Sequence, residues 1–298
     1  MDAAEAERLT VTCRAARPED RLEMLEITHT IWDGKDYVPR VWDEWLADES
    51  GLLAVAESDG RVRGFGKLTR LSDDSWWLEG LRVHPDFEGR GIATRLQEYL
   101  TAAWRKIGSG VLRLATSAER VQVHRLCARS GFSLIGERVL YQAPSLEKGE
   151  HHFIAIEKDD LEAALRVIAA SQLVQTQSGL IDLGWQWAVP VRELLLDPVA
   201  DQRAYWWRGA PTDAMLLYME DEPEEDEPDQ PVIPTIQLLA CPLESLAACL
   251  HDFRRLAAEA GFESAAWVAP YQPEVIAALE DAGYERQWEG SLYLFAKG

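Results

Sequence analysis

Cysteine is scarce in this chain, and the few cysteines are not paired in sequence. Cys13, Cys127, Cys241 and Cys249 lie far apart among 298 residues, and none belongs to a Cys-x-x-Cys pair. Zinc cages and small disulfide frameworks depend on such paired spacings. The cysteine pattern therefore predicts no bound metal, reduced thiols and a cytoplasmic location.

Positive charge is also scarce. The chain has 30 lysines and arginines against 51 aspartates and glutamates, which gives a formal net charge of −21 at pH 7. A surface this acidic repels nucleic acids and anionic lipids, so neither is expected as a partner. It suits a cationic or amine-bearing substrate, although solubility explains the same charge more simply.

Long apolar runs are missing as well. No hydrophobic stretch approaches transmembrane length, and residues 1–8 lack the apolar segment of a secretory signal. We therefore expect a protein that is neither exported nor embedded in a membrane, and that acts as a monomer or homodimer. Hydrophobic residues make up 47% of the chain, which supports real cores, and the length of 298 residues predicts two domains.

The most informative segment runs from Leu81 to Thr94. An extended run, Trp76 to Val83, precedes it, and a helix is predicted from Gly91 to Ile107 because apolar residues recur there every three or four positions. The first turn of such a helix has free N–H groups and a partial positive charge, and glycines let an anion approach the backbone. The segment therefore predicts a strand, loop and helix that can hold a diphosphate.

This loop resembles the acetyl-CoA loop of the GCN5-related N-acetyltransferase (GNAT) family. The family turn reads Gln/Arg-x-x-Gly-x-Gly/Ala, and this chain supplies Gly91 and Ala93 but has Glu88 at the first position. The resemblance implies acetyl-CoA as co-substrate. The residues implied to bind it are Leu81, Arg82, Val83, Glu88, Gly89, Arg90, Gly91, Ile92, Ala93 and Thr94, while Arg90, Arg95 and Arg129 are either phosphate ligands or solvated charges.

The order of elements in the first half fits the same resemblance. Strands are expected at 9–15, 52–57, 62–71, 76–83, 111–116 and 132–142, and helices at 18–32, 41–48, 91–107 and 118–130. This order is similar to that of the GNAT fold. The prediction is an α+β fold with a mixed sheet, in which residues 1–147 form a GNAT acetyltransferase domain.

The second half of the sequence resembles a diverged repeat of the first. Pro190 and Gly283 repeat the surroundings of Pro39 and Gly131 at an offset of about 150 residues, which indicates a tandem duplication. The strand expected at 235–240 runs into residues 241–245 without any glycine. Residues 148–298 are therefore predicted to be a degenerate GNAT-like domain that lacks the CoA loop and helps to close the acceptor site. The acidic insert at 221–229 is predicted to be a solvated loop.

Glu79 is the predicted catalytic base. It lies mid-strand among apolar residues, where desolvation raises the pKa of a carboxylate. Related enzymes place a catalytic glutamate nearby, and Gly80 would ease a strand bulge that exposes backbone N–H groups. The alternative is a strand-edge charge paired with an arginine such as Arg82.

The catalytic acid is less well marked. Many GNAT enzymes carry a tyrosine four residues before the glycine that ends the helix after the CoA loop, and counting back from Gly131 gives Cys127 instead. His124 and Tyr141 are the nearby substitutes, and solvent can also protonate a leaving thiolate. As structural alternatives, His124 is a surface helix residue and Tyr141 a strand aromatic.

The segment from Trp32 to Pro39 carries the acceptor information. Together with residues 78–83, it resembles the vertebrate histidine N-acetyltransferases, which acetylate a free amino acid. The implied substrate-binding residues are Trp32, Asp33, Asp36 and Tyr37, since a carboxylate can hold an ammonium group and a ring its methylenes. The alternative is that these residues only shape a loop.

Three functions remain open at this stage. The first is acetyl transfer to a small primary amine such as histidine. The second is the same chemistry on an aminoglycoside or other polyamine, which the net charge suits. The third is a non-catalytic CoA-binding sensor or scaffold, which the missing tyrosine favours.

Overall fold

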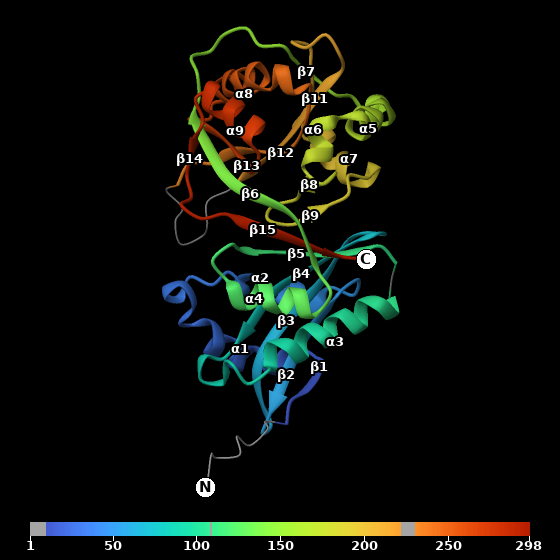
Figure 1. The fold of residues 1–298 in the computed structure, drawn as a ribbon, viewed down its shortest axis with the longest axis vertical. Helices are drawn as coiled ribbons and strands as arrows, with labels where there is room; N and C mark the ends of the chain where they lie inside the picture. The colour runs from blue at the N-terminus through green and yellow to red at the C-terminus, as the bar shows by residue number, and fades with distance from the viewer. Residues whose placement is uncertain (1–9, 108, 222–229) are drawn as a thin grey trace. The chain divides into compact units, whose positions relative to one another are not determined.

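The computed structural model describes residues 10–107, 109–221 and 230–298 (Figure 1). Contacts divide the chain into two compact units. The first holds the described residues up to Leu114 together with Gln122–Ser133 and Ala296–Gly298, and the second holds Ala115–Val121 and Leu134–Phe295. Of the acidic insert expected at 221–229, only Asp221 lies within the described residues.

A mixed sheet forms the centre of the first unit. Its strands lie in sequence order: β1 (Thr12–Ala15), β2 (Leu52–Ser58), β3 (Arg61–Ser72), β4 (Ser75–Val83) and β5 (Val111–Ser117). Neighbouring strands are antiparallel, except that β4 and β5 are parallel. The mixed sheet predicted from the sequence is confirmed.

Helices cover both faces of this sheet. Side chains alternate along β3, so Phe65 joins a core cluster with Ile27 of α1 (Arg21–Thr28) and Trp42 of α2 (Val38–Ala47). Gly64 and Gly66 face α3 (Ile92–Ile107) on the other side. A Cβ at Gly64 would lie 3.0 Å from the Ile92 side chain, so the missing side chains let α3 pack closely on the strand. The remaining helix is α4 (Val121–Arg129).

The helix predicted at 18–32 is shorter in the structure. A 3-10 turn, η1 (Pro18–Asp20), leads into α1, and a second 3-10 turn, η2 (Ile31–Gly34), follows it. Trp32 and Asp33 adopt left-handed conformations, with φ of 48° and 56°, which no α-helix continues. The next helix, α2, begins earlier than predicted because Pro39 fits its first turn.

The second unit repeats this topology. Its sheet runs β7 (Phe153–Ala155), β10 (Ala204–Trp207), β11 (Ala214–Asp221), β12 (Ile233–Ala240) and β13 (Ser264–Pro270). Again every pair is antiparallel except the last, β12 with β13. The helices are α5 (Leu161–Ala170), α6 (Gln172–Thr176), α7 (Arg192–Ala200), α8 (Leu246–Ala260) and α9 (Pro273–Asp281), with the 3-10 turns η4 (Lys158–Asp160) and η5 (Leu243–Ser245).

Smaller strands complete the second unit. A short hairpin joins β8 (Ile181–Asp182) to β9 (Trp187–Ala188), and β14 (Glu285–Arg286) precedes the last strand, β15 (Leu292–Lys297), which belongs to the second unit up to Phe295. The strands β7, β10, β11, β12 and β13 follow the same order and directions as β1 to β5, and the tandem duplication stays a prediction.

The strand predicted to finish the first sheet has a different place. This strand, β6 (Ser133–Pro144), pairs antiparallel with β13 of the second unit, from Pro144 opposite Ser264 to Arg138 opposite Pro270. Val139, Tyr141 and Ala143 alternate into the core cluster of that unit, which explains the pairing. The units defined by contacts therefore do not coincide with domains that divide at residue 147.

No helix among the residues that the structure describes combines the length and the apolar character needed to cross a membrane.

Candidate functional site

The two parallel strands of the first unit separate halfway along β4. The β4–β5 ladder comprises Ser75, Trp76 and Trp77 opposite Val111, Leu112 and Arg113. β4 itself continues to Val83, so its second half extends past this ladder. Backbone N–H groups without a strand partner are available to an extended ligand.

A bulge lies at the start of this second half of β4, where it pairs with β3. On β3, Phe65 and Lys67 are two positions apart, whereas their β4 partners Arg82 and Glu79 are three positions apart. Gly80 supplies the positive φ of 61° that the bulge needs, as the sequence predicted. A Cβ at Gly80 would lie 2.5 Å from the Trp45 ring, so the indole of α2 closes directly over the bulge.

The predicted phosphate loop follows at the end of β4. A 3-10 turn, η3 (Pro85–Phe87), leads through Glu88, Gly89, Arg90 and Gly91 into α3, and the predicted helix is confirmed. Gly89 and Gly91 have φ of 72° and 86°, and a Cβ added to either would meet no atom within 4 Å. The loop is therefore open above its backbone, and Ile92, Ala93 and Thr94 present the free N–H groups of a first helical turn.

Two guanidinium groups flank this loop. The Cζ of Arg90 lies 5.0 Å from the ring centroid of Phe87, and the Cζ of Arg63 on β3 lies 4.0 Å from the same ring. Arg90 was predicted from the sequence, whereas Arg63 was missed because it comes from a distant strand. Both charges favour an anion at the loop.

The predicted acceptor segment lies over the bulge. The Tyr37 hydroxyl accepts a hydrogen bond from the Gly80 backbone, and its ring meets the Trp45 ring edge to face at 6.0 Å. Burial raises the pKa of Tyr37 to about 12, so the hydroxyl stays protonated at neutral pH. The structure thus brings the segment and the bulge together, as the resemblance implied.

Asp36 has a different role from the predicted one. Its Oδ2 accepts from Arg82 Nε at 2.8 Å, and its Oδ1 accepts from Arg82 Nη2 at 3.2 Å and from the Val38 backbone at 3.2 Å. The Asp36 side chain is 1% exposed. Both oxygens are engaged inside the protein, so the prediction that Asp36 holds the substrate ammonium is corrected: it positions Arg82 and begins α2.

Trp32 and Asp33 are exposed at the edge of this segment. The Trp32 ring stacks on Tyr37 at 6.4 Å, and the Arg82 Cζ lies 4.9 Å from the Trp32 centroid. Two successive left-handed residues other than glycine store strain, which is common where a segment contacts a ligand. Of the predicted acidic residues, Asp33 is therefore the one left accessible to an acceptor.

Glu79 lies on the α1/α2 face of the sheet, beneath the same segment. It stands opposite Lys67, and the Thr69 hydroxyl donates to its Oε1. Its charge also acts on Tyr37, so the two groups share one environment. Arg82, the partner considered in the alternative view, pairs with Asp36 instead.

Lys67 was missed by sequence reasoning. Its side chain is 1% exposed, and its Nζ donates to Asp48 Oδ2 and to the Leu68 carbonyl. The pair ties the residue after α2 to β3, which fixes the helix that carries Trp45. In the sequence, a lysine within an otherwise apolar strand is the signal that could have identified this buried, paired residue.

The three residues considered for the catalytic acid lie on two elements, Cys127 and His124 on α4 and Tyr141 on β6. Cys127 is fully buried on α4, and burial raises the pKa of its thiol to about 11, as in a packing residue. His124 is half-buried on the same helix. Tyr141 belongs to the core of the second unit, as a strand aromatic does.

The described part of the chain contains no group of three or more histidine, cysteine or acidic side chains placed to hold a metal ion.

Comparison with known proteins places these features in context. Residues 20–132 match the family model described as "Acetyltransferase (GNAT) family". A histidine N-acetyltransferase of Xenopus tropicalis is 30% identical over 131 residues, covering 42% of this chain and 39% of that protein. A mycothiol acetyltransferase of Propionibacterium freudenreichii subsp. shermanii is 27% identical over 149 residues, covering 46% and 47%. The chain thus spans less than half the length of these curated relatives.

Solved structures show the same fold. A GCN5-related N-acetyltransferase from Sphaerobacter thermophilus superposes with a TM-score of 0.61 at 12% identity, covering 96% of this chain and 95% of that one. A glucosamine N-acetyltransferase region of a fungal β-N-acetylglucosaminidase superposes with a TM-score of 0.60 at 13% identity, covering 99% and 39%.

Proposed function

We propose that this chain, whose residues 20–132 match the GNAT acetyltransferase family model, is an acetyl-CoA-dependent N-acetyltransferase acting on a primary amine of a small molecule. The observation that carries the proposal is the second half of β4, which extends past the β5 ladder and ends in an open glycine loop at the N-terminus of α3. This arrangement suits a ligand with an extended amide-bearing arm and a diphosphate at one end.

The residues of the first unit fit such a ligand. The first-turn N–H groups of α3 and the open backbone at Gly89 and Gly91 would take the diphosphate, with Arg90 and Arg63 adding charge. The backbone of Leu81, Arg82 and Val83 would take the extended arm. The thioester would then lie near the Gly80 bulge, where N–H groups can stabilise a developing oxyanion.

The reaction requires one bond to form and one to break. The amine nitrogen attacks the thioester carbonyl carbon, the carbon–sulfur bond breaks, and the amine loses a proton. Glu79 is proposed to accept that proton, directly or through water. Thr69 would hold the Glu79 carboxylate in place.

Tyr37 is proposed to assist the departing sulfur. Because the Gly80 N–H donates to its oxygen, the hydroxyl hydrogen is left to donate elsewhere. With its pKa raised to about 12, full proton transfer to a thiolate is unfavourable, whereas a hydrogen bond to it is not. Tyr37 therefore stabilises the leaving group as a donor, and solvent completes its protonation.

A free amino acid such as histidine is the first acceptor to test. Support comes from the resemblance of the Trp32 to Pro39 segment and from the relative named as a histidine N-acetyltransferase. An aminoglycoside or other polyamine is the second candidate, because the net charge of −21 attracts polycations. The second unit is proposed to be a degenerate copy without catalytic activity.

Thiol release from acetyl-CoA is the direct test. Wild type, Glu79→Gln and a control, Glu98→Gln on the exposed side of α3, are assayed with histidine, other free amino acids and aminoglycosides. We expect turnover with one class of amine, a loss of about a hundredfold in kcat for Glu79→Gln, and none for Glu98→Gln. Tight CoA binding without turnover on any amine would instead favour a sensor.

A further inference from the structure

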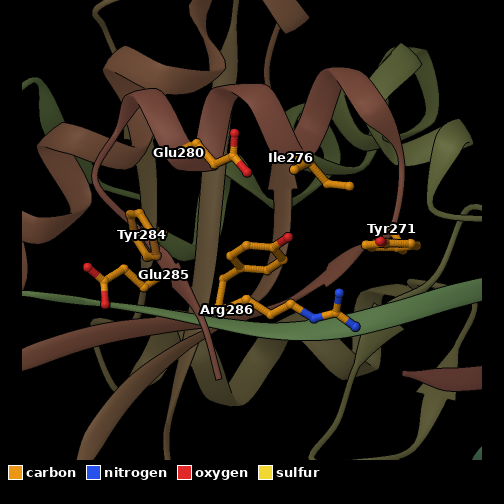
Figure 2. A pocket seen from close by; sticks show the side chains of 7 residues that line it. Tyr271, Ile276, Glu280, Tyr284, Glu285 and Arg286 are labelled. Carbon is orange, nitrogen blue, oxygen red and sulfur yellow. The ribbon is translucent and has the colours of Figure 1, made fainter. Parts of the chain in front are cut away.

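A cavity in the second unit has no part in acetyl transfer as proposed. Its volume is about 360 Å³, near the lower end of the range for pockets that bind small molecules. It lies between α9 and the paired strands β6 and β14 (Figure 2). We call it the α9 pocket; its lining residues are Tyr141, Tyr271, Ile276, Glu280, Tyr284 and Arg286, with Glu285 at its edge.

The walls of the α9 pocket are aromatic. Tyr271 follows β13, Tyr284 follows α9 and donates its hydroxyl to the Leu250 carbonyl at 3.4 Å, and Tyr141 on β6 stands opposite Arg286 in the ladder. Ile276 lies one helical turn before Glu280, so both face the cavity from α9. Three rings and one aliphatic side chain suit the apolar part of a small ligand.

One wall carries a fixed positive charge. Arg286 donates from Nε to the Trp288 carbonyl at 2.6 Å and from Nη2 to the Glu289 and Gly290 carbonyls at 2.8 and 3.0 Å. Its Cζ lies 5.3 Å from the Tyr271 ring centroid. These contacts fix the guanidinium without neutralising it, because no carboxylate within the described residues forms an ion pair with Arg286.

The opposite wall carries a negative charge. Figure 2 shows the Glu280 carboxylate reaching from α9 toward the cavity, across from Arg286, while Glu285 points away to the edge. The Glu280 side chain is exposed, and among the residues that the structure describes its carboxylate forms no hydrogen bond or ion pair. Both charges nevertheless act on Tyr141, whose pKa is raised chiefly by burial, so they face a common space.

These two charges discriminate between classes of ligand. A simple amine would pair with Glu280 but be repelled by Arg286. A simple anion would pair with Arg286 but be repelled by Glu280, and also by the net charge of −21 of the whole chain. A ligand with an ammonium and a carboxylate group satisfies both. We propose that the α9 pocket binds a free α-amino acid, so that the second unit is an amino-acid-binding module in its own right.

Calorimetric titration of the full chain, without acetyl-CoA, tests this proposal. The probes are L-phenylalanine and L-histidine, each compared with the analogue that lacks the carboxylate, phenethylamine or histamine, and with the analogue that lacks the ammonium group. We expect binding of an amino acid and a loss of at least about tenfold in affinity for either analogue. No binding of either amino acid would overturn the proposal.

Variants separate this site from the acceptor site of the first unit. Glu280→Gln and Arg286→Gln should each weaken the titrated binding at least about tenfold, whereas Glu274→Gln, on an exposed position of the same helix, should not. Binding that is unchanged in Glu280→Gln would place the amino acid elsewhere and refute the assignment. Arg286 also donates hydrogen bonds to three carbonyls, so its variant could lower stability, and thermal unfolding of each variant is therefore measured as well. The Glu280 side chain makes no such contacts, so Glu280→Gln tests binding without this complication.

The proposal does not depend on the transferase activity. Acetyl transfer by Glu280→Gln is expected to be retained at saturating acceptor, so a failure of catalysis and a failure of amino-acid binding are observed in separate assays.

Discussion

Arg82 and Asp36 form a buried, two-contact ion pair across 46 positions of sequence, with Arg82 Nε 2.8 Å from Asp36 Oδ2 and Nη2 3.2 Å from Oδ1. Their side chains are 11% and 1% exposed. The pair joins the acceptor segment to the β4 strand just after the Gly80 bulge. Because a carboxylate between two elements fixes both, the pair sets how Tyr37 lies over the proposed thioester position.

Asp36→Asn should therefore disturb the acceptor more than the cofactor. Leaving Arg82 buried without its partner should lower the free energy of unfolding by about 3 kcal/mol. We expect a raised KM for the amine and little change in KM for acetyl-CoA, measured by steady-state kinetics below the unfolding temperature. Arg21 and Asp43 form an exposed pair, so Asp43→Asn is the control and should change neither value. An equal rise in both KM values would contradict this role.

Tyr37→Phe removes the proposed donor to the departing sulfur but keeps the ring stacking. We expect kcat to fall about a hundredfold with KM for acetyl-CoA unchanged. Cys127→Ala, at the position where related enzymes carry tyrosine, should retain kcat because that thiol is buried and protonated. The opposite result, loss in Cys127→Ala and retention in Tyr37→Phe, would reassign the donor.

Gly80→Ala tests the bulge itself. The added Cβ would have a φ of 61° and lie 2.5 Å from the Trp45 ring, a rigid neighbour that cannot yield cheaply. We expect a loss of at least about 2 kcal/mol in unfolding free energy and weaker CoA binding. Gly60→Ala provides the comparison, since Gly60 has a φ of 73° but a Cβ added to it would meet no atom within 4 Å. In that variant the free energy of unfolding should fall only by the cost of placing alanine at a positive φ. Similar losses in both variants would mean that the Trp45 contact is unimportant.

Asp182 should make the stability of the protein depend on pH. Burial raises its pKa to about 7, and its Oδ2 is buried without a hydrogen-bond partner among the described residues. Because its pKa is higher in the folded than in the unfolded state, the folded state holds the extra proton between about pH 4 and 7. The contribution of this group to stability is therefore full at low pH and is lost as pH rises through 7.

Asp182→Asn should abolish that dependence, because the amide does not titrate. From pH 5 to pH 8, chemical denaturation should show the free energy of unfolding of the wild type falling by on the order of 3 kcal/mol relative to that of the variant. The amide oxygen of the variant side chain can still accept from the Gly184 and Trp185 backbone, at the 3.0 Å contacts that Asp182 makes. A constant difference between the two proteins at both pH values would contradict the shift.

Local sequence patterns predicted the strand, loop and helix that run from β4 to α3. The apolar spacing from Ile92 to Ile107 predicted α3, and the glycines before it predicted a loop open above its backbone; both are determined by short-range periodicity and backbone freedom. The sequence likewise predicts a bulge at Gly80, and the register between β3 and β4 contains one there. Arg63 was not found, because its place beside Phe87 follows from the pairing of β3 with β4.

The acceptor half required the tertiary structure. Sequence alone assigned Asp36 to the substrate, since a carboxylate in a loop next to a tyrosine suits an amine, yet its partner Arg82 comes from another element. The place of Tyr141 in the second unit also required the tertiary structure. Its strand alternates as predicted, but alternation does not say which sheet a strand joins.

By itself the sequence determined the mixed sheet and the strand, loop and helix from β4 to α3, because each depends on residues close together in the chain. Only the tertiary structure decided that β6 pairs with β13, that Asp36 serves Arg82, and that Glu280 faces Arg286 across a cavity. Those three relations join residues brought together by packing, where burial and charge pairing select among partners that local patterns leave equivalent.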